Sequence, residues 1–348
     1  MAPLSILDLS PVAAGMSGTT ALRNSLDLAR HVDRLGFTRY WVAEHHNLPS
    51  IASSAPEIMI GQIAAITTHM RIGSGGVMLP NHAPLMVAER FKVLEALYPG
   101  RIDLGIGRAP GTDQVTSYAL RRRQDVRDDD DFLERFQELM LLESRGFPDN
   151  HPFSRILAMP ADVPLPPIWL LGSSDYSAEL AAAIGGGFAF AHHFAGHDAV
   201  AAMRSYRDHF KPSATRQRPW AVLATAAICA ATDEEAERLA ASADLNFVRR
   251  MKGEYLPFAS PDDALAYPYS PAEREAARQN RARLFVGTGA TVREKLAPLI
   301  AATGADEVMI TTMVFDHAAR KRSYELLAAA FGLRPADAAR PEPERAMP

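Results

Sequence analysis

The sequence is nearly free of cysteine, because Cys229 is the only one among its 348 residues. One thiol excludes an internal disulfide framework and a metal centre built from several cysteines. Cys229 lies in the apolar run 221–231, so we expect a buried structural side chain rather than a nucleophile. A large excess of charge is also missing, since the formal net charge is −4 at pH 7. That balance argues against nucleic acid or an anionic membrane as the main partner.

Several signals for particular compartments and sites are absent as well. No run approaches the ~20 apolar residues that cross a bilayer, and no basic segment followed by a long apolar stretch marks a secretory signal. We therefore expect a soluble, cytoplasmic protein with no membrane partner. The adjacent residues His45 and His46 belong to no His-x-His or His-Glu-x-x-His pattern, so we expect no metal site there.

What the sequence does contain is a repeated pattern of a short apolar run followed by an amphipathic segment. The apolar runs fall at 6–9, 40–43, 71–77, 102–106, 168–171, 188–191, 222–230 and 308–311. The segments between them have helical spacing, as in the predicted helices at 84–97, 177–184 and 290–302. Eight strand-then-helix units predict an α/β protein whose parallel sheet closes into a (β/α)8 TIM barrel.

Two long segments interrupt this pattern and predict insertions after strands 4 and 7. Residues 146–166 are rich in proline, and residues 252–283 hold four prolines and three tyrosines. We interpret the second as a long loop that either closes over a pocket or forms a surface insertion. The single barrel domain is predicted to span residues 1–333, followed by a mobile tail at 334–348.

Charged runs at 121–123 and 127–131 precede a predicted helix. Solvated charges, with aspartate near a helix start, explain both runs. A contact between one arginine of the first run and a phosphate remains an alternative.

Four predicted strands end in residues suited to binding a cofactor, and in a barrel these ends converge. Arg108, between glycines at the fourth strand end, is suited to gripping a phosphate. Ser173 and Ser174 follow Gly172 and open a helix, which makes either an N-cap or an anion site. Gly75 and Gly76 form either a bulge or a surface against which a flat ring lies. His45 and His46 end the second strand.

These segments together resemble the bacterial-luciferase-like flavin-dependent monooxygenases, in their single-chain, non-luminescent branch. The resemblance rests on six stretches in order along the chain, which are YWVAEHHN (40–47), IGSGGVMLP (72–80), YPGRIDLGIGR (98–108), PIWLLGSS (167–174), LFVGT (284–288) and ADEVMI (305–310). It implies a (β/α)8 barrel that binds reduced FMN, uses O2 and forms a homodimer.

The resemblance also implies roles for particular residues. His45 matches the catalytic histidine beside the flavin, and Arg108 matches the phosphate-binding arginine. Gly75 and Gly76 match a pair joined by a non-proline cis peptide under the flavin ring. The turn that contacts the phosphate side is matched by Leu171, Gly172, Ser173 and Ser174. Gly107 is a departure, because it stands where the light-emitting subunit has a reactive cysteine.

The implied reaction oxygenates a small organic substrate through a flavin C4a-peroxide, with His45 titrating near neutral pH to move a proton. His46 and His193 are candidates for the substrate pocket. No Gly-x-Gly-x-x-Gly fingerprint follows an early strand, so a separate flavin reductase is expected to supply the reduced FMN. Three alternatives remain: an F420-dependent dehydrogenase on the same fold, a non-catalytic flavin-binding protein, and a metal-dependent barrel hydrolase.

Overall fold

The computed structural model describes residues 2–109, 111–121 and 131–335, and these form a closed barrel of parallel strands. The eight barrel strands are β1 (Leu4–Asp8), β2 (Arg39–Val42), β3 (Arg71–Ser74), β5 (Ile102–Gly107), β6 (Ile168–Gly172), β7 (Gly187–Ala191), β8 (Ala221–Cys229) and β10 (Glu307–Thr311). Strand β10 pairs with both β8 and β1, which closes the circle. The predicted (β/α)8 TIM barrel is confirmed.

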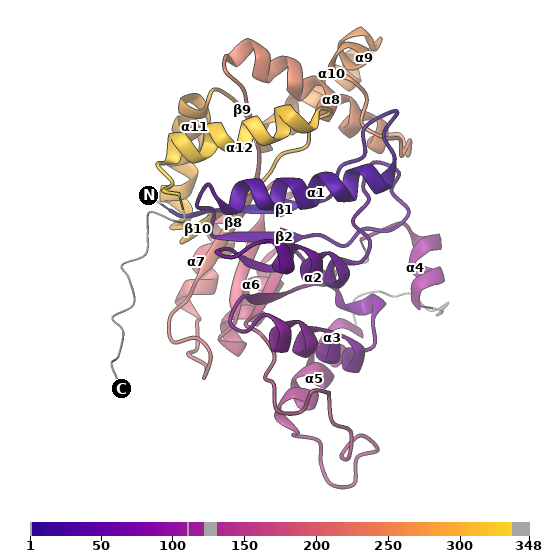
Figure 1. Ribbon diagram of the computed structural model, residues 1–348, viewed down its shortest axis with the longest axis vertical. Coiled ribbons are helices and arrows are strands. Elements are labelled where there is room, and N and C mark those ends of the chain that lie inside the picture. Colours follow the sequence, from indigo (N-terminus) through magenta and orange to yellow (C-terminus); the bar gives the residue numbers. More distant parts are fainter. Residues whose placement is uncertain (1, 110, 122–130, 336–348) are drawn as a thin grey trace.

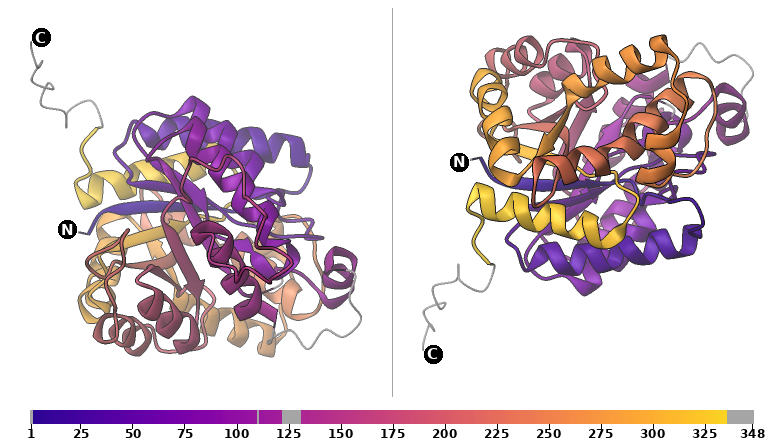
Figure 2. Two further views of the ribbon diagram at one scale, coloured as in Figure 1. Left: turned by 90° about the horizontal axis from the view of Figure 1, so that it is seen from below. Right: turned by 90° about the horizontal axis from the view of Figure 1, so that it is seen from above.

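Helices surround the strands and bury the apolar sides that their sequences carry (Figure 1). The helices that lie between successive barrel strands or after the last one include α1 (Gly18–Asp33), α2 (Pro56–Ile66), α3 (Pro84–Leu97), α6 (Asp175–Ile184), α7 (Ala199–Asp208), α11 (Gly289–Thr303) and α12 (His317–Phe331). Helix α3 has the predicted bounds. Proline is favourable at its first position because a backbone N–H there would have no hydrogen-bond partner within the helix. The last helix, α12, lies beside α1 (Figure 2). No helix in the described ranges is both long and apolar enough to cross a bilayer.

The insertions fall where they were predicted, after β5 and after β8. The first carries α4 (Gln114–Arg121) and α5 (Asp131–Ser144), and residues 122–130 between them lie outside the described residues, as does the tail from 336. The second carries α8 (Asp233–Met251), α9 (Pro261–Ala266), α10 (Pro271–Asn280), η2 (Arg281–Arg283) and β9 (Leu284–Gly287), the last of which pairs with β8. Short elements β4 (Val77–Met78) and η1 (Leu79–Asn81) follow β3.

The expectation of a structureless loop at 252–283 is wrong, because α9 and α10 lie within it. Ser260 caps α9 by accepting a hydrogen bond from the amide of Asp263, and Ser270 forms a capping box with Glu273 on α10. In both helices a proline follows the capping serine, which is a recognisable helix start. Both helices pack beside α8 (Figure 1). Residues 252–283 therefore contain two capped helices and are not one long loop.

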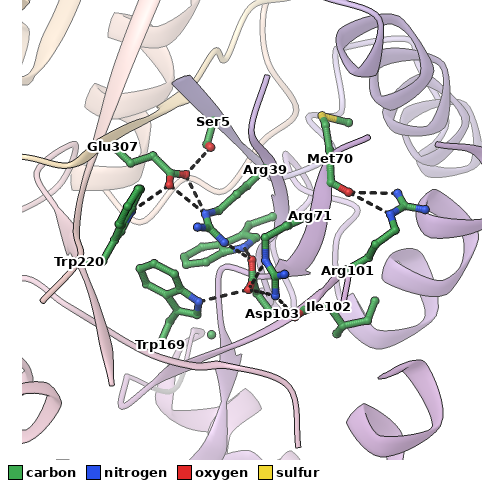
Figure 3. A network of polar contacts seen from close by, with 12 residues as sticks. Ser5, Arg39, Met70, Arg71, Arg101, Ile102, Asp103, Trp169, Trp220 and Glu307 are labelled. Carbon is green, nitrogen blue, oxygen red and sulfur yellow. Dashed lines mark hydrogen bonds and ion pairs between the residues drawn. The ribbon is translucent and has the colours of Figure 1, made fainter. Parts of the chain in front are cut away.

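A buried ionic network fills the barrel at the end where the strands begin (Figure 3). Asp103 receives hydrogen bonds from Arg39 Nη1 at 2.7 Å and from Arg71 Nη2 at 2.7 Å. Arg39 Nε also donates to Glu307 at 2.9 Å. Burial alone would raise the pKa of Asp103, but the two arginines hold it below its ordinary value. These side chains occupy the end of the barrel where the strands begin, so a binding cavity is to be looked for at the opposite end.

Candidate functional site

A cavity of about 660 Å³ lies at the carboxyl ends of the barrel strands. This is the end at which TIM barrels carry their active sites. The predicted site residues that line it are His45, Gly75, Gly76, Arg108, Leu171, Gly172, Ser173, Ser174 and His193. Residues that are far apart in the sequence therefore meet at one mouth, as the convergence of the strand ends predicts.

The peptide bond between Gly75 and Gly76 is cis and lies between β3 and β4. Both positions leave little room for a side chain, and at Gly76 the obstacle is backbone. A Cβ atom on Gly75 would lie 2.6 Å from Leu7 Cδ1, and one on Gly76 would lie 2.9 Å from the carbonyl oxygen of Gly105. The pair thus packs tightly against the barrel on one side and lines the cavity on the other.

Arg108 leaves the end of β5 and reaches the start of α6. Its guanidinium carbon lies 4.7 Å from the ring centroid of Tyr176, in the first turn of that helix. Ser174 is the N-cap residue, yet its side chain makes no capping hydrogen bond. Arg108 and Ser174 therefore place a cation and a hydroxyl at a helix N-terminus, an arrangement suited to an anion such as phosphate.

Close packing also limits which residues fit at two further glycine positions of the site, Gly172 and Gly107. A Cβ on Gly172 would lie 2.2 Å from Ser177 Oγ, so the turn that carries Ser173 into the cavity needs glycine. A Cβ on Gly107 would lie 2.9 Å from Met78 Sδ. The side chain of Met78 occupies the room that a residue with a side chain at position 107 would need.

His45 lines the cavity and differs in one respect from the sequence expectation. Burial, followed by the charge of Arg250, lowers the pKa of His45 to about 4. The expected titration near neutral pH is therefore wrong, and the imidazole is neutral at pH 7. Its Nδ1 atom is buried and has no hydrogen-bond partner among the described residues.

His46 is the predicted pocket residue that the structure places elsewhere. It is not among the residues that line the cavity, and its Nε2 atom lies 2.8 Å from Glu44 Oε1. Neighbouring residues at a strand end point in opposite directions, so His45 and His46 cannot share one pocket. Glu44 also contacts His82 Nε2 at 2.9 Å and accepts a hydrogen bond from the amide of Met78 at 2.8 Å.

Glu44 is a positioning residue that the sequence reasoning missed. Its side chain is buried, which works to raise its pKa, but hydrogen bonds from His46 and His82 lower the pKa to about 2. The carboxylate thereby ties the end of β2, which carries His45, to β4 through the amide of Met78. Only its position next to His45 in the sequence hinted at this role.

His193 lines the cavity as expected, and its Nδ1 lies 3.2 Å from the carbonyl oxygen of Ala224. Burial lowers the pKa of His193 to about 4, so this ring is also neutral at pH 7. Cys229 lies away from the cavity lining and is buried, and burial raises its pKa to about 12. The thiol is therefore protonated at pH 7, which fits the expected structural role.

Sequence reasoning also missed the part of one cavity wall that α8 supplies. Helix α8 and the segment after it contribute residues that include Asn246, Phe247, Arg250, Tyr255, Phe258 and Arg283. Of the two interpretations of residues 252–283, the structure favours the one in which they border a pocket. Arg121, the described member of the first charged run, donates from Nε to Asn81 Oδ1 at 3.0 Å and does not line the cavity.

Known proteins match the chain over nearly its whole length. The profile of the luciferase-like monooxygenase family matches residues 3–307. A luciferase-like monooxygenase of Escherichia coli strain K12 is 44% identical over 322 residues, which cover 92% of this chain and 95% of that protein. An N-acetyl-S-alkylcysteine monooxygenase of Bacillus subtilis is 36% identical over 331 residues, covering 94% and 97%. The crystal structure of apo-MsnO8 superposes with a TM-score of 0.87 at 39% identity, covering 96% and 100%.

Proposed function

The chain belongs to the luciferase-like monooxygenase family and is an oxidoreductase, and from this premise we propose that it oxygenates a small organic substrate with reduced FMN and O2. One observation carries the proposal. Arg108, the two serines at the start of α6, the cis glycine pair and His45 all border a single cavity. The resemblance of the sequence to the family assigns each of them to contact with the flavin.

The residues present fit a flavin nucleotide. Arg108, Ser173 and Ser174 would hold the phosphate, since a guanidinium and hydroxyls at a helix N-terminus suit an anion. Gly75 and Gly76 would support the ring, because their backbone borders the cavity with no side chain in the way. When bound, reduced flavin supplies two electrons, so that one oxygen atom of O2 enters the substrate and the other leaves as water.

His45 would hold or move a proton beside the ring. A neutral imidazole has one N–H and one free nitrogen, so it can donate and accept at once. The pKa of about 4 keeps the ring neutral across the physiological range. His45 lines the cavity, which places its ring within reach of a ligand bound there.

The inner part of the cavity is suited to excluding water. Apolar side chains contribute much of its wall, including Leu7, Leu9, Ile228, Met309 and Met313. Water reaching the reacting flavin would divert oxygen to hydrogen peroxide, so an apolar wall protects the coupling of oxygen use to product.

Two partners follow as proposals. A separate reductase supplies reduced FMN, because no Gly-x-Gly-x-x-Gly motif indicates a site for a nicotinamide dinucleotide. A second copy of the chain covers α2 and α3, which expose the large apolar side chains Ile58, Met86, Val93 and Leu97. Light scattering of the purified protein tests the homodimer, and a monomer at micromolar concentration would contradict it.

The central test measures O2 consumption with chemically reduced FMN and, separately, with reduced F420. A monooxygenase consumes O2 in the presence of reduced FMN and substrate, whereas a deazaflavin dehydrogenase on this fold transfers hydride without using O2. The named activity of the Bacillus relative makes N-acetyl-S-alkylcysteines reasonable first substrates to test. The proposal fails if the protein binds F420 and not FMN.

A further inference from the structure

One face of α8 forms a wall of the cavity. The residues of this helix that line the cavity are Ala243, Asn246, Phe247, Arg250 and Met251. Their spacing of three, one, three and one residues is that of a single helical stripe. Arg250 belongs to this stripe in the last turn of the helix, so its position at the cavity is set by the helix and not by a loop.

Arg250 carries a charge that nothing in the described part of the chain neutralises. Its guanidinium makes no hydrogen bond and no ion pair there, and the side chain is exposed at the rim of the cavity. The charge nevertheless acts on the site, because after burial it is the largest influence that lowers the pKa of His45. Arg250 and His45 therefore line the same cavity, close enough for the charge of one to act on the other.

Arg283 adds a second cation to this side of the cavity. Its Nη1 donates to the carbonyl oxygens of Phe194 at 3.1 Å and Ala195 at 3.0 Å, and its Nη2 donates to Asn280 Oδ1 at 3.3 Å. All three acceptors are neutral, so they fix the side chain without cancelling its charge. Arg283 lines the same cavity as Arg250.

The described part of the cavity lining has no negative charge to offset these cations. Among the described residues that line it there is no aspartate and no glutamate. Arg108, the remaining arginine of the lining, lies with Tyr176 at the start of α6 and is assigned to the flavin phosphate. Arg250 and Arg283 come instead from the insertion after β8, and they remain for a second anion.

We propose that Arg250 and Arg283 bind a carboxylate of the organic substrate, which makes the substrate class a small organic acid. This inference rests on the proposed monooxygenase function and names the substrate class for the same site. The apolar remainder of the acid lies along the part of the cavity formed by Ala224, Ala226 and Ile228 on β8. A carboxylate is the group that guanidinium side chains bind best through paired hydrogen bonds.

The test compares matched acids and amides by calorimetric titration of the purified protein, with and without FMN. N-acetyl-S-benzylcysteine, 3-phenylpropionic acid and hexanoic acid are each paired with the primary amide, which keeps the shape and removes the charge. At least one acid is expected to bind about tenfold or more tightly than its amide, as for a charge-assisted contact. Equal binding of every acid and its amide, or binding of no acid at millimolar concentration, would overturn the proposal.

Variants locate the contact. Arg250→Gln is expected to remove the preference for the acid and leave amide binding unchanged, and Arg250→Lys to restore part of it. Arg249→Gln is the matched control, because Arg249 precedes Arg250 on the same helix but does not line the cavity. A preference that survives in Arg250→Gln would show that the acid binds elsewhere.

A separate FMN titration distinguishes this inference from the proposed function. Arg250→Gln should bind FMN like the wild type. Weakened FMN binding in that variant would assign Arg250 to the cofactor and overturn the inference, while leaving the monooxygenase proposal intact. A wild-type protein that prefers acids to amides yet binds no FMN would overturn the proposed function and leave the carboxylate site standing.

Discussion

The guanidinium of Arg108 lies over the ring of Tyr176, with its central carbon 4.7 Å from the ring centroid. The contact joins the end of β5 to the first turn of α6, two elements separated by the whole first insertion. The face of the aromatic ring attracts the guanidinium through a cation–π interaction. The contact therefore holds the cation beside the helix N-terminus.

Arg108→Gln should weaken FMN binding. Loss of one charge-assisted contact to a phosphate is expected to cost about 1.5–3 kcal/mol, or roughly 10- to 150-fold in affinity. Quenching of flavin fluorescence measures the dissociation constant. Arg204→Gln removes the same charge from an exposed position on α7 and should leave it unchanged. Equal affinity in the Arg108 variant and the wild type would remove Arg108 from the phosphate site.

His45→Ala should bind FMN but use oxygen wastefully. Without the imidazole, proton movement beside the ring slows, and more of the oxygen consumed is released as hydrogen peroxide. The measurement is the ratio of product to O2 consumed, with peroxide assayed in parallel. His197→Ala, at an exposed position outside the cavity lining, is the control. If both variants couple as well as the wild type, His45 has no role in the proton transfer.

Stability should fall as the solution is made acidic. His45 and His193 each have a pKa of about 4 in the folded protein, against 6.5 without the protein environment. Between these values the unfolded chain binds more protons, so the free energy of unfolding decreases as the pH drops from about 6.5 to 4. Each histidine contributes a slope of up to about 1.4 kcal/mol per pH unit.

Denaturant unfolding at pH 7, 6 and 5 measures this dependence. His45→Asn and His193→Asn should each make the curve flatter over that window, and the double variant should flatten it further. A double variant whose stability depends on pH as steeply as that of the wild type would show that other groups dominate acid destabilisation.

Asp103→Asn should destabilise the barrel strongly. The change leaves the buried Arg39 and the half-buried Arg71 without the carboxylate that they share. Removal of one partner of a buried ion pair costs about 3–5 kcal/mol. Chemical denaturation gives the change in unfolding free energy, and Asp162→Asn at an exposed position provides the reference. A loss no larger than that of the reference would mean that the network carries little stability.

The regular part of the fold could be predicted from the sequence because its signals are local. The apolar run at 102–106 and the proline-initiated helix at 84–97 each depend on neighbours within a few residues, and both were placed correctly. The helices α9 and α10 were missed although Ser260 and Ser270 cap them, because the four prolines of residues 252–283 were interpreted as the mark of a long loop.

Site residues could be predicted from the sequence only where they directly follow a predicted strand. Arg108 and the glycine pair follow apolar strands directly, so their convergence follows from the barrel. Arg250 gave no such signal, because it lies in a helix whose cavity-facing stripe has the same spacing as a stripe facing the core. The pKa of His45 was mispredicted because burial and a cation from a distant helix set it.

The sequence by itself determined that this protein is a barrel of parallel strands with an arginine, Arg108, at the end of one strand, because apolar periodicity and glycine placement act over short distances. It also determined that Cys229 is a structural residue and not a nucleophile. Tertiary structure alone decided which side chains share the cavity, which histidine faces it, and where unneutralised charge remains. Those properties depend on burial and on the field of groups far apart in the chain, and no local pattern records them.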